Sequence, residues 1–342
     1  MTNDTSTTAA VRWMLAPLSA AYAGVIRARN LYYDRVDSSV RHAELPVISV
    51  GNITVGGTGK TPLVIEVVRR LRETGRRPAV LTRGYKAEAG KTADEVKEFE
   101  AEWPGVPVIV NPDRVAGART ARDGGEVDCL VLDDGFQHRR LARDLDIVLI
   151  DALSPWGGGK VLPGGRLREP LRSLRRADIF VLTRVNQVEP AVLKGIRAGL
   201  RRWGRDKPVC EAAVRPVRLA LRDGREMSPA EIGGRSVLLV SGIGNPATFE
   251  KLVVSLGPKL CAPHAIFADH HRFTQADAAG LAAEAAAAQA DLVVTTRKDW
   301  VKLASLWPDD AADLARLDVE LALVAGADEF EARLQRALEK SP

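Results

Sequence analysis

The chain has few cysteines and few aromatic residues. Its three cysteines, Cys129, Cys210 and Cys261, lie far apart and form no C-x-x-C pair. This pattern excludes a disulfide scaffold and a cysteine-based zinc site, and it indicates a reducing compartment. Aromatic residues make up 5% of the sequence and the basic residues are scattered, so no nucleic-acid partner is expected.

The N-terminal apolar run is too short to cross a membrane. Residues 13–26 number 14, which is about 21 Å as a helix, against about 30 Å of hydrocarbon in a bilayer. A secretory signal peptide is also disfavoured, because Arg27, Arg29 and Arg35 follow the run and no small-x-small cleavage site is clear.

The same run has the spacing of an amphipathic helix. Its apolar residues at helical spacing are Leu15, Leu18, Tyr22 and Val25, with Trp13, Tyr32 and Tyr33 at the ends. Aromatic ends and flanking arginines are typical of a helix lying in a lipid interface. A helix packed on its own domain fits the pattern equally well, so the segment alone leaves both interpretations open.

Length and composition indicate a globular protein. With 342 residues the chain is long enough for two domains, at roughly 150 residues each. The sequence is 46% hydrophobic and 27% charged, and 49 basic against 44 acidic residues give a net charge of +5. This mild excess suits anionic partners such as phosphorylated ligands or acidic lipid headgroups without choosing among them.

From Pro46 onward, short runs of branched apolar residues alternate with helical or loop segments. The runs lie at 46–50, 78–82, 106–110, 128–133, 146–151 and 178–183, and a second series lies at 236–242, 291–296 and 319–324. Buried runs joined by helical crossovers predict a mostly parallel sheet with helices on both faces. The stretch 208–230, between the two series, predicts a domain boundary.

The most specific local signal is the glycine-rich turn between a buried strand at 46–50 and a helix starting at Lys60. Its glycines permit positive φ and close approach of a polyphosphate, Lys60 can reach the β- and γ-phosphates, and the Thr61 hydroxyl can ligate Mg²⁺. Thr54 stands where the usual G-x-x-x-x-G-K-[ST] pattern has its first glycine. The residues expected to contact the nucleotide are Thr54, Val55, Gly56, Gly57, Thr58, Gly59, Lys60 and Thr61.

A carboxylate for the metal is expected at the end of a neighbouring strand. Asp133 and Asp134 follow four apolar residues, and Gly135 lets the chain turn away. Adjacent carboxylates on an extended chain point to opposite sides, so one can hold Mg²⁺ while the other faces another part of the site. The sequence does not decide which of the two contacts the metal directly, and Asp-Asp-Gly is also a common turn.

These signals predict a P-loop NTPase-like α/β fold with a second, smaller α/β domain. The expected segments are an N-terminal interfacial helix at 1–36, a P-loop domain at 37–212 and a lid at 213–342, whose last helix is free to pack on the P-loop domain. An ATPase or GTPase switch that controls membrane attachment or a partner protein is an alternative. The guanine motif is a poor match, since Lys298 in Thr296–Asp299 stands one position late.

Several further motifs resemble the tetraacyldisaccharide 4′-kinases, which phosphorylate the lipid A precursor. They occur in order along the chain: GNITVGGTGKTP (51–62), TRGY (82–85), DE within TADEV (92–96), NPDRVAGA (111–118), DDGFQHRRLARDLDIVLIDA (133–152), LPGGRLREP (162–170), SGIGNP (241–246), FADHHRF (267–273) and TTRKDWVKL (295–303). The combination of GGTGKTP with DDGFQH is the most specific part of the match.

The resemblance implies a reaction and a catalytic pair. ATP, with Mg²⁺, would donate its γ-phosphoryl group to the 4′-hydroxyl of a tetraacyldisaccharide 1-phosphate, forming lipid IVA. Asp94 would accept the hydroxyl proton, paired with His270 across the two domains, and His271 is the less favoured histidine. Asp94–Glu95 could otherwise simply open a helix, and Ala93 and Val96 depart from the glycine and proline usual in the family.

Arginine motifs add candidates for phosphate contacts. By resemblance, Arg168 and Glu169, with Arg83 and Arg114, are candidates for clamping phosphate and for contacts around the reacting groups. Arg168 and Glu169 are also expected to contact the nucleotide. Gly158 stands where the family commonly has asparagine, so any contact of that side chain would be absent.

The resemblance also implies a place of action. It favours the interfacial interpretation of the N-terminal helix and a peripheral location on the cytoplasmic face of the bacterial inner membrane. The expected partners are the lipid disaccharide and an anionic membrane surface. No nucleic acid and no stable protein partner are implied.

Overall fold

The computed structural model describes residues 15–84, 96, 99–100, 102–269 and 271–339. The expectations for Asp94 and His270 fall outside the described residues. The chain divides into two compact units, Met1–Ala213 with Leu321–Pro342, and Val214–Glu320. It passes from one unit to the other within two long strands, β7 (Val209–Leu221) and β13 (Leu314–Ala325).

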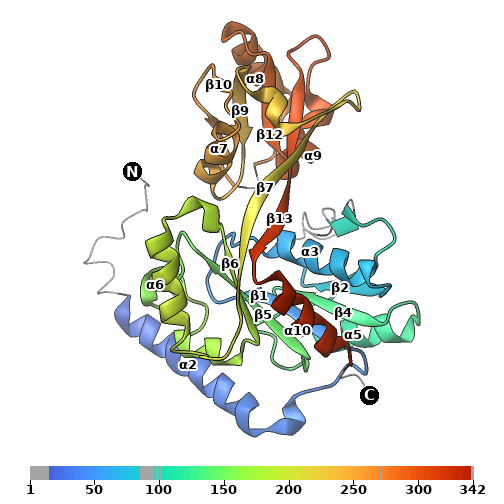
Figure 1. Ribbon diagram of the computed structural model, residues 1–342, viewed down its shortest axis with the longest axis vertical. Helices are drawn as coiled ribbons and strands as arrows, with labels where there is room; N and C mark the ends of the chain where they lie inside the picture. Colours follow the sequence, from blue (N-terminus) through green and yellow to red (C-terminus); the bar gives the residue numbers. More distant parts are fainter. Residues whose placement is uncertain (1–14, 85–95, 97–98, 101, 270, 340–342) are drawn as a thin grey trace. The chain divides into compact units, whose positions relative to one another are not determined.

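In the first unit, seven strands of the sheet follow the order β3-β2-β4-β1-β5-β6-β7 (Figure 1), and every neighbouring pair among them is parallel. Its other strands are β1 (Val47–Asn52), β2 (Pro78–Thr82), β3 (Val108–Val110), β4 (Cys129–Asp133), β5 (Leu145–Asp151) and β6 (Ile179–Thr183). Its helices are α2 (Ala16–Arg35), α3 (Lys60–Glu73), α5 (Arg114–Asp123), α6 (Pro190–Leu200) and α10 (Ala327–Glu339). Short 3-10 helices, η1 to η4, lie at Asp37–Ser39, Gly157–Gly159, Leu171–Arg176 and Val185–Gln187.

Both faces of this sheet are buried, which explains why its strands are uninterrupted apolar runs. On β5, Ile147 and Leu149 belong to the core cluster that contains α3 and α10, whereas Val148 and Ile150 belong to the cluster that contains α6. Side chains that alternate between two apolar layers need no polar face. The predicted parallel sheet with helices on both faces is therefore confirmed.

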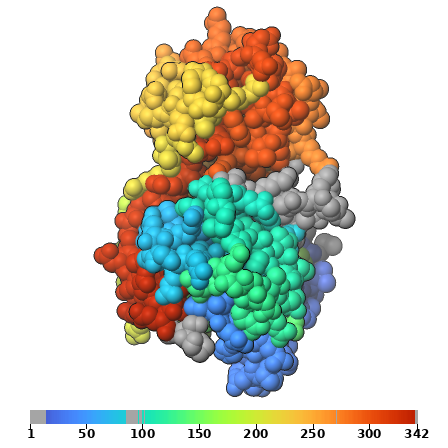
Figure 2. Space-filling view, turned by 90° about the vertical axis from the view of Figure 1, so that its right-hand side faces the viewer, coloured from blue at the N-terminus to red at the C-terminus, as the bar shows by residue number. Residues whose placement is uncertain are grey.

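The last helix, α10, packs on the first unit. Its Phe330 and Leu334 are buried in the same cluster as Leu63 of α3, and Glu331 pairs with Arg70 at 3.2 Å. Figure 2 shows α10 (red) beside α3 on the surface. The residues from Leu321 onward make most of their contacts with the first unit. The sequence analysis placed 213–342 in the second domain, but it allowed the last helix to pack on the first.

The N-terminal helix α2 packs on the first unit with one side and exposes apolar residues on another. Tyr22 and Ala23 pack against the cluster of α6, and Ile26 is buried. Leu18 and Val25 are instead 58% and 67% exposed. The sequence grouped Leu18 and Val25 with Leu15 and Tyr22 on one face. In the structure the buried face is centred on Ser19, Ile26 and Asn30, so Tyr22 packs at its edge, whereas Leu18 and Val25, each one residue before a buried position, are exposed.

The second unit is also an α/β layer structure. Its strands follow the order β10-β9-β12-β13-β7, with β11 on β9 and β8 on β7. They are β8 (Glu226–Met227), β9 (Ser236–Ser241), β10 (Lys259–Leu260), β11 (Ala265–Ile266) and β12 (Leu292–Thr296), and the helices are α7 (Pro246–Val254), α8 (Gln275–Ala287), α9 (Arg297–Leu303), η5 (Pro229–Ile232) and η6 (Ala304–Leu306). Neighbouring residues of β9 again face different cores, with Leu239 beside α7 and Leu238 beside α8.

Candidate nucleotide-binding site

The glycine-rich turn leads from the end of β1 into the first turn of α3. Gly56 and Gly59 have φ values of 111° and 86°, in the left-handed region that favours glycine. Gly59 is the N-cap residue, so Lys60 and Thr61 begin the helix. A helix start leaves backbone N–H groups without helical partners, and these are suited to bind phosphate.

The loop is held from one side by residues at the end of β6. The Thr183 hydroxyl donates to the Thr58 carbonyl at 3.1 Å, and Arg184 donates to the Gly57 carbonyl at 2.6 Å. The Thr58 hydroxyl accepts from the Asn52 amide at 2.7 Å and is buried. Sequence reasoning missed Thr183 and Arg184, although both stand at the end of a predicted strand, where parallel strands bring their carboxyl ends to one edge.

On the other side the loop pairs with a short extended segment. Thr54 forms an antiparallel bridge with Leu167, and Val55 N–H donates to the Arg166 carbonyl at 2.8 Å. Arg168 N–H donates to the Ile53 carbonyl at 2.7 Å. The expected residue Arg168 is thus adjacent to the loop, because its backbone is bonded to the beginning of the loop.

The acidic pair lies at the same edge of the sheet. Asp133 ends β4 opposite Val50 of β1, and its Oδ2 accepts from the Thr82 hydroxyl at 3.3 Å. Asp134 follows with φ 53°, and its two oxygens face two cations. Oδ1 lies 3.7 Å from Lys60 Nζ, and Oδ2 accepts from Arg168 Nη1 at 2.6 Å.

These two cations control the charge of Asp134. Partial burial by itself would raise the pKa of the carboxyl, but Lys60 and then Arg168 outweigh it, so the pKa lies below its ordinary value. Asp134 is therefore ionised at neutral pH. Lys60, Asp134 and Arg168 form one chain of charges beside the loop.

Gln137 was also missed by sequence reasoning. Its amide donates to the Asn52 carbonyl at 2.8 Å, and its oxygen accepts from Arg168 at 3.4 Å. It therefore connects β1 with Arg168. Its place in DDGFQH, three residues after Asp134, is the signal that could have identified it.

Burial lowers the pKa of two further groups near the acidic pair, Arg114 and His138. Arg114, whose α5 is capped by Asp113, donates to the Asp133 carbonyl at 3.3 Å, and burial lowers its pKa to about 10. Burial, reinforced by the charge of Arg114, lowers the pKa of His138 to about 4. His138 is therefore neutral at pH 7. Arg83 follows β2 and adds positive charge near both groups.

Glu169 faces the other way from Arg168. It is fully buried, and its carboxylate accepts from Asn30 at 2.8 Å and from Arg176 at 3.0 Å. Burial alone would raise the pKa of Glu169, but Arg176 and these hydrogen bonds lower it. The structure thus places Glu169 against α2 and η3.

In the second unit, the described neighbours of position 270 are fixed by local contacts. His271 Nε2 lies 3.2 Å from Asp277 Oδ2, and its ring packs between Phe267 and Phe273. Asp269 pairs with Lys298 at 3.2 Å. His271, the less favoured histidine of the motif, is therefore bound to the start of α8.

The described residues contain no group of three or more histidine, cysteine, aspartate or glutamate side chains that could hold a metal on their own.

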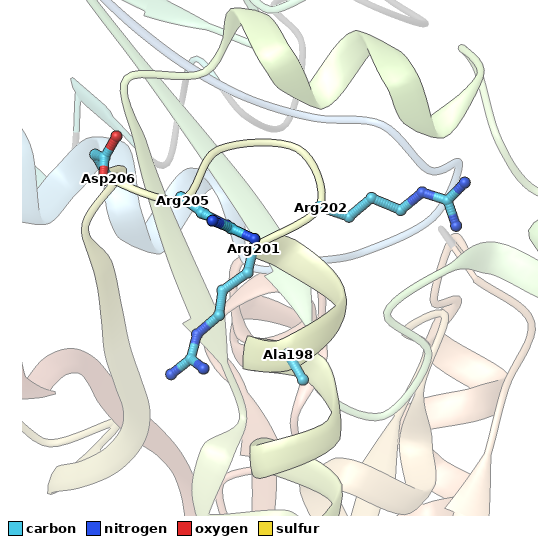
Figure 3. A pocket seen from close by; sticks show the side chains of 5 residues that line it. All are labelled: Ala198, Arg201, Arg202, Arg205 and Asp206. Carbon is cyan, nitrogen blue, oxygen red and sulfur yellow. The ribbon is translucent and has the colours of Figure 1, made fainter.

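A pocket at the end of α6 is lined by Ala198, Arg201, Arg202, Arg205 and Asp206 (Figure 3). Arg201 and Arg202 point in different directions at the helix end, and Arg205 comes from the loop that follows. None of the predicted site residues lines it, so it is a feature separate from the glycine-rich loop.

No helix among the described residues is long and apolar enough to pass through a bilayer.

Comparison with known proteins gives the same family as the sequence motifs. A family model described as tetraacyldisaccharide-1-P 4′-kinase matches residues 11–339. A tetraacyldisaccharide 4′-kinase of an Anaeromyxobacter species is 42% identical, over 95% of this chain and 92% of its own length.

Two more distant organisms give the same result. The tetraacyldisaccharide 4′-kinase of Bdellovibrio bacteriovorus is 36% identical, over 88% of this chain and 92% of its own length. The crystal structure of the "apo" form of LpxK from Aquifex aeolicus in complex with ATP superposes with a TM-score of 0.74 at 30% identity, covering 96% of this chain and 99% of that one. These matches do not favour a switch protein. The chain belongs to the tetraacyldisaccharide-1-P 4′-kinase family.

Proposed function

We propose that the loop of residues 54–61 is where this family member carries out its reaction. The activity is ATP-dependent phosphorylation of a tetraacyldisaccharide 1-phosphate on its 4′-hydroxyl, in the biosynthesis of lipid A. The observation that supports the assignment to this loop is the 3.7 Å contact between Lys60 and Asp134. It joins the two motifs that phosphoryl transfer requires, a cation for the phosphates and a carboxylate for the metal.

The phosphates are proposed to bind at the start of α3. Gly56 and Gly57 are exposed, and a Cβ added at Gly57 would meet no atom within 4 Å, so the backbone is open to a ligand. Lys60 would move from Asp134 to the β- and γ-phosphates. Arg168 would stabilise charge on the transferred group, since phosphoryl transfer depends mainly on positioning and electrostatics.

Mg²⁺ fits the oxygen donors of this edge. Thr61 supplies a hydroxyl, and Asp133 and Asp134 supply carboxylates, of which Asp134 Oδ1 is buried and accepts no hydrogen bond. Mg²⁺ in such enzymes is held by one or two carboxylates together with phosphate oxygens, so no three-carboxylate cluster is needed. When bound, the ion neutralises charge on the phosphates. The choice between the two aspartates is left to experiment.

Asp94 is proposed to accept the proton of the 4′-hydroxyl, with His270 as its partner. A sugar hydroxyl is a poor nucleophile until its proton has an acceptor. The proposal is supported by the family to which the chain belongs and by the positions of DE and DHH in its sequence.

The helix α2 is proposed to lie on the cytoplasmic face of the inner membrane. We call its exposed residues Leu18, Ala21, Val25 and Ala28 the apolar stripe, because they recur at helical spacing. Leu18 and Val25 are each more than half exposed. The arginines at the end of α6 (Figure 3) add positive charge in the same unit, which favours an anionic lipid surface.

The proposal is tested by incubating the protein with labelled ATP and the tetraacyldisaccharide 1-phosphate in detergent micelles. The label is expected to appear in the glycolipid with wild-type protein and to be lost with Lys60→Ala. Arg69→Ala is the control, since it removes another cation of α3 that pairs only with Glu66 and Glu73 on the same helix among the ion pairs found. Near-normal turnover by Lys60→Ala would refute the assignment of the loop.

A further inference from the structure

We infer that α2 positions Arg168 for phosphoryl transfer, through hydrogen bonds from Tyr22 and Asn30 to the segment Arg168–Glu169. The inference rests on the proposed function, because it requires Arg168 to act on the transferred group. Tyr22 and Asn30 are positioning residues in this account. They act on the reaction through Arg168.

The segment Arg166–Arg168 lies between the glycine-rich loop and α2. On the loop side, Arg168 N–H donates to the Ile53 carbonyl at 2.7 Å, and Val55 N–H donates to the Arg166 carbonyl at 2.8 Å. On the helix side, the Tyr22 hydroxyl donates to the Arg168 carbonyl at 2.9 Å. A displacement of α2 would therefore be transmitted to the backbone that holds both Arg168 and the beginning of the loop.

The side chains of Arg168 and Glu169 also connect the site to α2. Arg168 reaches Asp134 at 2.6 Å, whereas the next residue, Glu169, points to α2 and accepts from Asn30 at 2.8 Å. The backbone bends at Arg168 and Glu169, and the two neighbouring side chains leave it toward different partners. Fixing Glu169 against α2 therefore also fixes the direction in which the Arg168 guanidinium leaves the backbone.

Burial makes this connection stiff. Glu169 is 0% exposed, and Arg29 of α2 lies 3.4 Å from its Oε1. A buried carboxylate that loses a partner is costly, so the segment has one strongly preferred position on the helix. Ser19 adds a further bond near the start of α2, where its hydroxyl accepts from Gly164 N–H at 2.8 Å.

The loop that carries Asp134 is attached to the same helix. Arg139 donates to the Asn30 carbonyl at 2.8 Å and to Asp34 Oδ1 at 2.7 Å. Both partners of the Arg168–Asp134 ion pair thus belong to segments bonded to α2. The residues of the apolar stripe are exposed, so contact with lipid through them leaves these bonds in place.

The test measures turnover in detergent micelles, where membrane attachment does not limit the rate. Tyr22→Phe removes one hydroxyl and is expected to lower kcat about 3- to 10-fold, with KM for the lipid little changed, because one hydrogen bond is lost. Asn30→Ala is expected to lower kcat further, and thermal unfolding verifies that it is folded. Tyr32→Phe is the matched control, because it makes the same change at a tyrosine of the same helix that is 53% exposed, and it should leave kcat unchanged.

The decisive measurement is a double-mutant cycle with Arg168→Ala. If Tyr22 acts through Arg168, Tyr22→Phe should cause no further loss in the Arg168→Ala protein, whereas a general effect on folding would lower both backgrounds equally. An equal loss in both backgrounds, or a wild-type kcat for Tyr22→Phe, would overturn the inference. Active Lys60→Ala protein in the same assay would instead show that the proposed function is wrong, and the inference would fall with it.

Discussion

Lys60 Nζ lies 3.7 Å from Asp134 Oδ1, and the other oxygen of Asp134 is bound by Arg168 at 2.6 Å. Three motifs that are distant in the sequence therefore meet at one carboxylate. The left-handed backbone of Asp134, with φ 53°, turns the side chain toward these two cations. Among residues other than glycine this conformation is uncommon, although aspartate and asparagine tolerate it best, and it is found often at functional sites.

Asp134→Asn is expected to lower kcat/KM about 100-fold, because the amide cannot neutralise the metal or balance Lys60 and Arg168. The rate of glycolipid phosphorylation measures the effect, and thermal unfolding measures whether the fold persists. Asp128→Asn is the control, since it alters a carboxylate of similar exposure just before the same strand. Equal activities of the two variants would contradict the role of Asp134.

Asp94→Ala is expected to lower kcat about 100-fold or more while KM for the lipid changes little, since a general base acts in the transition state. Steady-state kinetics over a range of lipid concentrations separate the two constants. Glu100→Gln changes an exposed carboxylate a few residues away and serves as the control. A change confined to KM would mean that Asp94 only binds substrate.

Much of the site follows from the sequence because local pattern and parallel topology together place it. The turn at 54–61 and the acidic pair at 133–134 both lie at the ends of buried strands, and parallel strands that are neighbours end at the same edge. These two facts are enough to predict that Lys60 and Asp134 lie close together. The fold class was predicted for the same reason.

Other features depend on contacts that no local pattern reveals. Arg168 and Glu169 are adjacent in the sequence and were expected to share a role, but the backbone bends there and Glu169 is buried against α2 and η3, bonded to Asn30 and Arg176. Arg184 was missed because an arginine after a strand is usually solvated. Only the tertiary structure brings it to the Gly57 carbonyl.

Replacing two residues of the apolar stripe, Leu18→Ser with Val25→Ser, is expected to reduce binding to vesicles that contain anionic lipid. Serine removes apolar area that would otherwise leave water in the interface. Flotation with vesicles measures the bound fraction. Val301→Ser on α9, where the valine is 61% exposed, is the matched control. Unchanged flotation of the double variant would argue that α2 only packs on its own unit.

His138 makes the folded protein sensitive to moderate acid. Its pKa is about 4 in the folded state against an ordinary value of 6.5, so between these pH values the unfolded chain binds more protons than the folded one. The stability that neutral His138 contributes is complete above pH 6.5 and is lost as the pH falls toward 4. Denaturant unfolding of wild-type and His138→Gln protein at several pH values from 7 to 4 measures this contribution.

The difference in unfolding free energy between the two proteins should change in favour of His138→Gln as the pH falls through this range. Comparing the two proteins removes the titration of all other groups, provided that the substitution leaves their surroundings unchanged. His42→Gln makes the same change at an exposed histidine before β1 and is the matched control. Parallel profiles for wild-type and His138→Gln protein would mean that His138 has the same pKa in the folded and unfolded states. That result would contradict a folded-state pKa lowered by burial and by Arg114.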